Sequence, residues 1–232
     1  MAYLLHPSGG LPYHLRALFW RHSLWAPFHA QARRWLTDWR PEAGHLVLIG
    51  PSGGYVLTAQ FLERFARIDV LEPDPLARWL LRRRFPGFNF SWGESAYLPR
   101  PGGFARLAAS YPRAAFLFCN LLGQELQGQP ADFDRGAWLA ELEPALAGRA
   151  WGSWHDLAST RRKPDRAPPP RLAHAMALDE LLARCWTGGS LEIVDHATAG
   201  LCPAAPRRLA IWHLAPRSHH LIEWLDAAQP RP

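Results

Sequence analysis

Lysine and cysteine are scarce in this 232-residue chain, and long apolar runs are lacking. Of its 26 basic residues only one is lysine, and its cysteines are too few and too widely spaced for a CxxC pair: Cys119, Cys185 and Cys202. This usage excludes a disulfide framework or a cysteine-based zinc site and predicts reduced thiols. No stretch reaches the roughly 18–20 apolar residues of a membrane span, and the N-terminus lacks the charged-then-apolar order of a signal peptide. We therefore expect a cytoplasmic protein with no membrane segment.

What the chain does contain is ample material for a packed core. Its hydrophobic content of 48% with 20% charged residues excludes a disordered chain, and its length suits one domain. The net charge of +6 attracts phosphate backbones in principle. The arginines, however, are scattered apart from clusters at residues 82–84 and 161–166, so nucleic acid is a partner that the charge permits but does not favour. A protein partner stays open.

The order of the apolar and helical segments predicts an α/β fold. Strand-like and helix-like segments alternate, which implies a mostly parallel sheet with helices on both faces. The expected strands are residues 46–49, 68–71, 88–91, 114–119 and 150–154, and the expected helices are residues 57–64, 75–84, 133–147 and 178–185. The strand-like runs 191–194 and 209–213 are expected to pair antiparallel, and residues 220–225 fit a third strand or a terminal helix.

Two further segments complete the organisation. Residues 1–40 carry apolar side chains at helical spacing and are expected to form an N-terminal helical cap broken near Pro27, on a domain of residues 41–232. Residues 159–171 are too rich in proline and charge to pack and predict an exposed, mobile loop.

The most informative segment is residues 45–55, HLVLIGPSGGY, where an apolar strand runs into a turn of small residues. An acid, Glu72, follows 22 positions after Gly50, at the end of the next expected strand. A strand, a glycine turn opening a helix and an acid after the second strand form a nucleotide-binding unit. A dinucleotide fingerprint needs glycine at 50, 52 and 55; Ser52 and Tyr55 stand at the last two, which disfavours a nicotinamide or flavin site.

With these residues, the chain resembles the class I S-adenosylmethionine-dependent methyltransferase superfamily over residues 44–125. The resemblance implies that the turn lets the backbone approach the methionine and ribose part of the cofactor, through Gly50, Ser52, Gly53 and Gly54. It implies that Glu72 binds the ribose hydroxyls and that the segment Gly93, Glu94 and Ser95 binds the adenine amine, with Trp92 or Tyr97 covering the base. A carboxylate suits both tasks because it accepts hydrogen bonds from a vicinal diol or an amine. Asp74 is expected instead to cap the helix that begins near Pro75.

The sequence departs from that family's pattern at two positions of the turn. Leu48 stands where an acid is common, two residues before Gly50, and Ser52 replaces the middle glycine of the spacing GxGxG at positions 50, 52 and 54. Asn120 follows the fourth expected strand, where ligands bind in open α/β sheets, but its surroundings are not the Asn-Pro-Pro-Tyr signature. The acceptor is therefore not identified by this motif.

Candidates for a catalytic base are few. We place Asn120 at the acceptor. His155 and Asp156 are expected to follow the fifth strand, at the same sheet edge, with the aspartate supporting the histidine as a catalytic base. The other histidines, in Asp195-His196, His213 and His219-His220, fit no standard metal-binding spacing, so no metal site is predicted. Cys119, among apolar neighbours, is expected to be a buried, inert thiol, whereas Tyr13, His14 and Trp20 of the cap are candidates for the acceptor pocket.

The function that follows is methyl transfer from S-adenosylmethionine to a small-molecule or peptide acceptor. Three alternatives stay open: a non-catalytic binding or scaffold protein of the same fold, an RNA-modifying enzyme, and an aminopropyl transferase.

Overall fold

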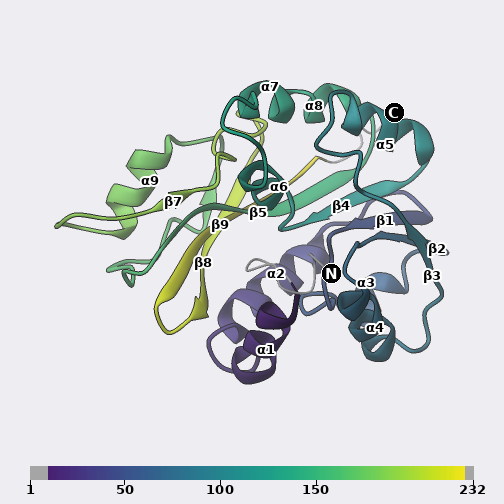
Figure 1. Cartoon of the computed structure of the whole chain (residues 1–232), viewed down its shortest axis with the longest axis horizontal. Coiled ribbons are helices and arrows are strands. Elements are labelled where there is room, and N and C mark those ends of the chain that lie inside the picture. The colour runs from purple at the N-terminus through teal and green to yellow at the C-terminus, as the bar shows by residue number, and fades with distance from the viewer. Residues whose placement is uncertain (1–9, 228–232) are drawn as a thin grey trace.

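The central feature of the fold is a single mixed sheet (Figure 1). The computed structural model describes residues 10–227, and within that range the sheet has nine strands. Eight follow the order β3-β2-β1-β4-β5-β9-β8-β6, and β7 pairs with β5. The strands are β1 (His45–Ile49), β2 (Arg67–Leu71), β3 (Phe90–Gly93), β4 (Ala115–Cys119), β5 (Trp151–Thr160), β6 (Arg171–Leu172), β7 (Val194–Asp195), β8 (Arg207–Ala215) and β9 (Ser218–Ala227).

Strands β1 to β5 are parallel, whereas β6 to β9 join the sheet antiparallel. Helices cover both faces: in Figure 1, α1 to α4 lie on one side of the sheet and α5, α7 and α8 on the other. The helices are α1 (Gly10–Trp20), α2 (Ala26–Asp38), α3 (Ala59–Leu62), α4 (Pro75–Arg84), α5 (Gly103–Ser110), α6 (Leu122–Gln127), α7 (Arg135–Ala140), α8 (Leu142–Ala145) and α9 (Leu178–Cys185). This architecture confirms the predicted Rossmann-like α/β class with antiparallel C-terminal strands.

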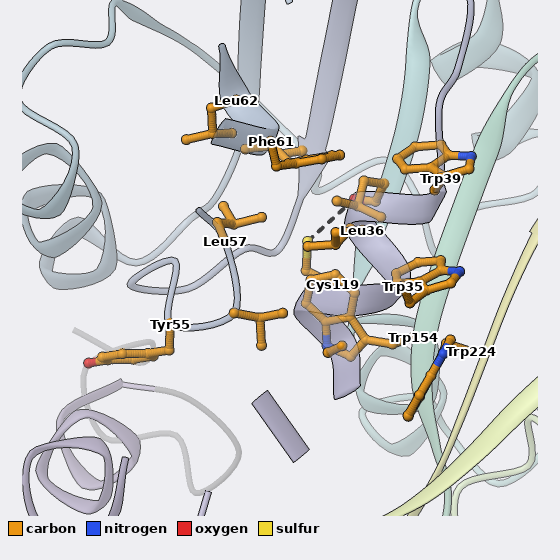
Figure 2. Packing of buried hydrophobic residues seen from close by; sticks show 14 of the residues in the cluster. Trp35, Leu36, Trp39, Tyr55, Leu57, Phe61, Leu62, Cys119, Trp154 and Trp224 are labelled. Atoms are coloured by element: carbon orange, nitrogen blue, oxygen red, sulfur yellow. Dashed lines mark hydrogen bonds between the residues drawn. The ribbon is translucent and has the colours of Figure 1, made fainter. Parts of the chain in front are cut away.

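The central strands β1 and β4 read as nearly continuous apolar runs because both of their faces are buried. In β1, side chains of Leu46 and Leu48 enter the core beneath α1 to α4, and those of Val47 and Ile49 enter the core on the α5 side. Two tryptophans at the end of α2 contribute to the first core: Trp35 of the helix and Trp39 directly after it stack with their rings 7° from parallel, beside Trp154 (Figure 2). Helix α2 therefore packs directly on the sheet through large aromatic surfaces.

The C-terminal part differs from the expectation in its strand pairing. Strand β8 pairs with β9, a strand of ten residues, so the pairing predicted between residues 191–194 and 209–213 was wrong. The short β7 pairs instead with the extension of β5. Strand β5 runs to Thr160, six residues beyond the predicted end, because β9 continues the pairing there.

Several helix boundaries also differ. The helix predicted over residues 133–147 is divided into α7 and α8, since Pro144 has no N–H to bond the carbonyl of Ala140, where α7 ends. The break in the N-terminal segment precedes Pro27, which lies in the first turn of α2. Helices α5 and α6 were not predicted. Helices α1 and α2 account for the part of the predicted cap that the structure describes, and residues 1–9 lie outside it.

Residues 159–171 are largely exposed, as predicted, although β5 includes the first two of them. The backbone N–H groups of Asp165 and Arg166 both bond the carbonyl of Cys185, which ties this loop to the end of α9. Among residues 10–227, no helix has the length and apolarity needed to cross a membrane.

Candidate functional site

The predicted nucleotide-binding residues lie along one edge of the sheet, in register. Ile49, Leu71 and Gly93 are direct neighbours across β1, β2 and β3. The residue after each of them is Gly50, Glu72 or Glu94, and all three line one cleft of about 560 Å³. The strand order reverses between β1 and β4, and in open α/β sheets ligands bind at the carboxyl ends of the strands beside such a reversal.

The turn after β1 needs glycine at two positions for reasons of space and conformation. Gly50 and Gly54 have φ of 65° and 66°, where L side chains are strained. A Cβ at Gly50 would lie 2.9 Å from Leu121 Cδ1, and one at Gly54 would lie 2.4 Å from Leu81 Cδ1. Ser52 adopts φ 53°, the same left-handed region, in place of the expected middle glycine. The glycines therefore let the turn pack against protein side chains at both ends. Gly50 and Ser52 line the cleft, whereas Gly53 and Gly54, also predicted to bind the cofactor, are not among its lining residues.

Glu72 holds this turn through both of its carboxylate oxygens. Oε2 accepts a hydrogen bond from Ser52 N at 2.8 Å, and Oε1 accepts one from Asp74 N at 3.0 Å. The side chain is buried, and burial raises its pKa to about 7 even though the two backbone donors favour the ionised form. Each oxygen keeps a second lone pair, so the carboxylate retains acceptors for a ligand.

Asp74 has the structural role that the sequence predicted. Its Oδ1 accepts from Leu76 N at 2.8 Å and caps α4, with Pro75 in the first turn. Its Oδ2 lies 3.4 Å from His14 Nε2, and His14 Nδ1 contacts the Tyr55 hydroxyl at 2.8 Å. Burial lowers the pKa of His14. This chain of contacts links α1 to the glycine turn and to α4.

The third segment of the predicted cofactor site lines the same cleft. Gly93 is the last residue of β3, and glycine is needed there because a Cβ would lie 2.5 Å from Leu71 Cδ2. Glu94 is exposed at the cleft and Ser95 is buried in it. Trp92, however, is not among the residues that line the cleft, and neither is Tyr97.

Trp92 instead lies beneath two arginines of α4, and this position corrects its predicted role. The guanidinium carbons of Arg78 and Arg82 lie 5.3 and 4.7 Å from its ring centre. Trp92 therefore packs against the outer helix and does not cover a base in the cleft.

Asn120 follows β4 and lines the cleft in a strained backbone conformation. Its φ is 55°, which asparagine tolerates better than most residues. Its Nδ2 donates to Asp156 Oδ2 at 3.1 Å, and its Oδ1 accepts from Asp156 N at 3.0 Å. Both ends of the Asn120 amide are thus fixed by one residue of β5, which orients this side chain at the cleft.

The structure separates His155 and Asp156, which were predicted to act together as a catalytic base and its supporting acid. Both lie within β5 and not after it, and neighbouring residues of a strand project to opposite faces. His155 is fully buried on the far face, where Nδ1 contacts Ser153 Oγ at 3.0 Å and Nε2 lies 3.4 Å from Glu223 Oε1. The interpretation of His155 as a base at the sheet edge was wrong, because β5 extends past the predicted end.

Beyond Asn120 the cleft is lined by aromatic side chains, of which the sequence indicated only Tyr13. They come from four elements: Tyr13 of α1, Phe28 of α2, Trp154 of β5 and Trp212 of β8. Phe28 and Trp212 stack with ring centres 5.0 Å apart, and Tyr13 lies edge-on to Trp212. Of the cap residues proposed for this pocket, Tyr13 lines the cleft whereas Trp20 lines a separate groove.

Polar side chains of α6 complete this end of the cleft. Gln124 and Glu125 line it, and burial raises the pKa of Glu125. Helix α6 has only six residues, too few for a helical pattern of apolar side chains to show in the sequence. Their position after Asn120 was therefore the only indication of these two residues in the sequence. Cys119 also lines the cleft, and burial raises the pKa of its thiol, as expected for an inert group.

No protein-family model matches the chain, and no curated protein matches it. Among solved structures, the chain is similar to the N-methyltransferase NodS from Bradyrhizobium japonicum WM9 in complex with S-adenosyl-L-homocysteine, with TM-score 0.48 and 12% identity over 91% of this chain and 92% of that chain. It is similar to the glycopeptide N-methyltransferase MtfA complexed with S-adenosyl-L-methionine, with TM-score 0.40 and 13% identity over 87% of this chain and 94% of that one. A precorrin-6y C5,15-methyltransferase from Geobacter metallireducens GS-15 has TM-score 0.34 and 11% identity over 82% of this chain and 85% of that chain. These likenesses are remote, and the interpretation of the cleft depends on its own geometry.

Proposed function

We propose that the chain is a methyltransferase that uses S-adenosylmethionine and acts on a small-molecule or peptide acceptor. The observation that carries this proposal is the alignment of Gly50, Glu72 and Glu94 at one sheet edge, beside the strand-order reversal and in a single cleft. A cleft of about 560 Å³ lies within the usual range for small-molecule sites.

The residues present fit an adenosyl cofactor. Glu72 is oriented by two backbone donors and keeps free lone pairs, which suits a pair of ribose hydroxyls. Glu94 is exposed in the cleft one strand further along, where an amine could be bound. The backbone of Gly50 and Ser52, which line the cleft, would face the amino-acid end. When bound, the cofactor supplies an electrophilic methyl group on a positively charged sulfur.

The aromatic end of the cleft fits the remaining task, which is to hold an acceptor and exclude water. The faces of Tyr13, Trp154 and Trp212 attract cations and bury apolar surface. Asn120, fixed by Asp156, presents an oriented amide where the two halves of the cleft meet. Methyl transfer asks mainly for such positioning of the acceptor. Asp156 acts through Asn120 and is a positioning residue.

The test is calorimetric titration of the purified chain with S-adenosylmethionine, S-adenosylhomocysteine and NAD. We expect micromolar binding of both adenosyl compounds and none of NAD. Glu72→Ala and Glu94→Ala should weaken that binding at least tenfold, whereas Glu42→Ala, a matched exposed acid outside the cleft, should leave it unchanged. Unchanged affinity in both cleft variants would refute the cofactor site. Absence of binding by a folded wild-type chain would favour the non-catalytic alternative.

A further inference from the structure

Asp156, His196 and His220 meet behind the cleft although they are far apart in the sequence. Each offers one ligand atom, and these atoms all lie within 4.8 Å of one another. His220 Nδ1 lies 2.9 Å from Asp156 Oδ1, and His196 Nδ1 lies 4.0 Å from Asp156 Oδ2. We propose that these three side chains form a binding site for one divalent transition-metal ion of the zinc class, a role that spacing along the sequence did not predict.

A β-bulge builds the framework of this site. Asp156 pairs with Ile222 and Ala158 pairs with Leu221, so one extra residue of β5 is accommodated between them. The bulge places Ser159 opposite His220, on the face that carries Asp156. Bulges commonly redirect side chains beside functional sites. A regular strand would have directed Ser159 to the other face, away from both histidines.

The outer nitrogens of both histidines are held by serine hydroxyls. His196 Nε2 lies 3.1 Å from Ser159 Oγ, and His220 Nε2 lies 3.1 Å from Ser218 Oγ. Metal-ligating histidines are typically held in this way, through the ring nitrogen that does not bind the ion. His220 Nδ1 therefore contacts Asp156 Oδ1, whereas His196 Nδ1 lies 4.0 Å from Asp156 Oδ2 and contacts Gln127 Nε2 at 3.0 Å.

An ion bound here would replace two hydrogen bonds of the cluster. Gln127 Nε2 donates to His196 Nδ1 at 3.0 Å, so this nitrogen carries a lone pair and Nε2–H donates to Ser159. Asp156 Oδ2 accepts from the Asn120 amide. His220 Nδ1 donates to that carboxylate. An ion at His220 Nδ1 requires the ring proton on Nε2, where the Ser218 hydroxyl can turn to accept it.

The donor set selects the class of ion. Two imidazole nitrogens and one carboxylate suit zinc, cobalt, nickel or iron better than magnesium or calcium, which prefer oxygen ligands alone. The side chains of Asp156 and His196 are 4% and 6% exposed, whereas Gln127 is exposed at the edge of the cluster and offers an entry path. The Asn120 amide bonds Asp156 Oδ2, so the site adjoins the cleft through one side chain.

The experiment is a cobalt titration of the chelator-treated full chain, followed by visible absorption, with zinc as the competitor. We expect one tight equivalent whose spectrum disappears when zinc is added. His196→Gln and His220→Gln should weaken binding by more than about 100-fold, and Ser159→Ala by roughly 10–100-fold, as expected for an outer-shell partner. Near-ultraviolet circular dichroism in chelator establishes that each variant is folded, and Ser159→Ala provides the test if the histidine variants do not fold.

The matched control is His213→Gln. His213 Nδ1 contacts His219 Nδ1 at 2.7 Å, and this pair belongs to no carboxylate-containing cluster among residues 10–227. The control should keep the tight equivalent. The proposal is overturned if no stoichiometric cobalt binds, if Ser159→Ala in a folded chain binds as tightly as wild type, or if His213→Gln weakens binding as much as the cluster variants. None of these readouts requires a cofactor or an acceptor, so failure here is independent of the proposed methyl transfer.

Discussion

Glu72 should give folding and ligand binding opposite dependences on pH. Burial raises its pKa in the folded chain to about 7, from 4.5 for the unperturbed side chain. Asp74 raises it further, whereas two backbone donors and Arg78 lower it. The folded state therefore holds this proton more tightly than the unfolded state does. The stability linked to it is fully present below pH 4.5 and is lost as the pH rises to about 7.

The size of this effect follows from the pKa difference. Each pKa unit corresponds to about 1.4 kcal/mol, so roughly 3 kcal/mol of unfolding free energy should be lost between those pH values. Glu72→Gln has no proton to lose. Urea unfolding of both proteins from pH 4.5 to 8 should show the stability of the wild type falling by this amount relative to the variant.

Binding should follow the opposite trend because the ionised carboxylate is the better acceptor for two hydroxyl groups. With a pKa of about 7, about a tenth of the chains are ionised at pH 6 and about nine tenths at pH 8, so affinity for S-adenosylhomocysteine should rise about tenfold. The rise should be absent in Glu72→Gln. A stability difference between wild type and variant that stays constant from pH 4.5 to 8 would refute this reasoning, since the two backbone donors would then outweigh burial.

Three further predictions concern the framework of the site. Gly54→Ala should lower the free energy of unfolding by about 2–4 kcal/mol, because its Cβ would lie 2.4 Å from a leucine methyl of α4 and its φ is positive. Gly87→Ala, which meets nothing within 4 Å, is the control in urea unfolding. Arg207→Met should lower the free energy of unfolding by about 3–5 kcal/mol, because it leaves the Glu223 carboxylate buried without its partner at 2.8 Å. In thermal unfolding, the double variant with Glu223→Leu should recover much of that loss. Asp74→Ala should cost about 1 kcal/mol by removing the α4 cap, and Asp74→Ser, which keeps a capping oxygen, should cost less; equal losses measured by urea unfolding would exclude capping as the cause.

The parallel half of the fold was predictable because its signals are local. The helix over Pro75–Arg84 begins and ends where the sequence predicted, since an aspartate cap and a proline mark its start. Strands β1, β2 and β4 are short, largely apolar runs, and Glu72 directly follows β2; Glu94 directly follows β3, which lies two residues beyond its predicted range of 88–91. The position of these acids at one edge then follows from parallel pairing alone. Their shared cleft is a property of the strand order, which the βα alternation implies.

The antiparallel half was not predictable because its pairings connect distant segments. The end of β5 is set by β9, since Thr160 pairs with His219, 59 residues later, and no residue near Trp154 signals that the strand continues. Placing His155 and Asp156 in a loop followed from that missing information. The aromatic wall of the cleft has the same origin, since Trp212 reaches it only through the β8–β9 hairpin.

The β5–β9 pairing therefore determines two chemical features at once. It directs His155 away from the cleft into the buried contact with Glu223, and it directs Asp156 toward Asn120 and His220. One strand residue thus orients the amide in the cleft and supplies the carboxylate of the proposed metal site. An ion bound there would hold Asp156, and through it Asn120, in a single position. Disturbing that pairing at the bulge should consequently weaken the metal site and release the Asn120 amide together. Disturbing the glycine turn should affect only the part of the cleft proposed to bind the cofactor.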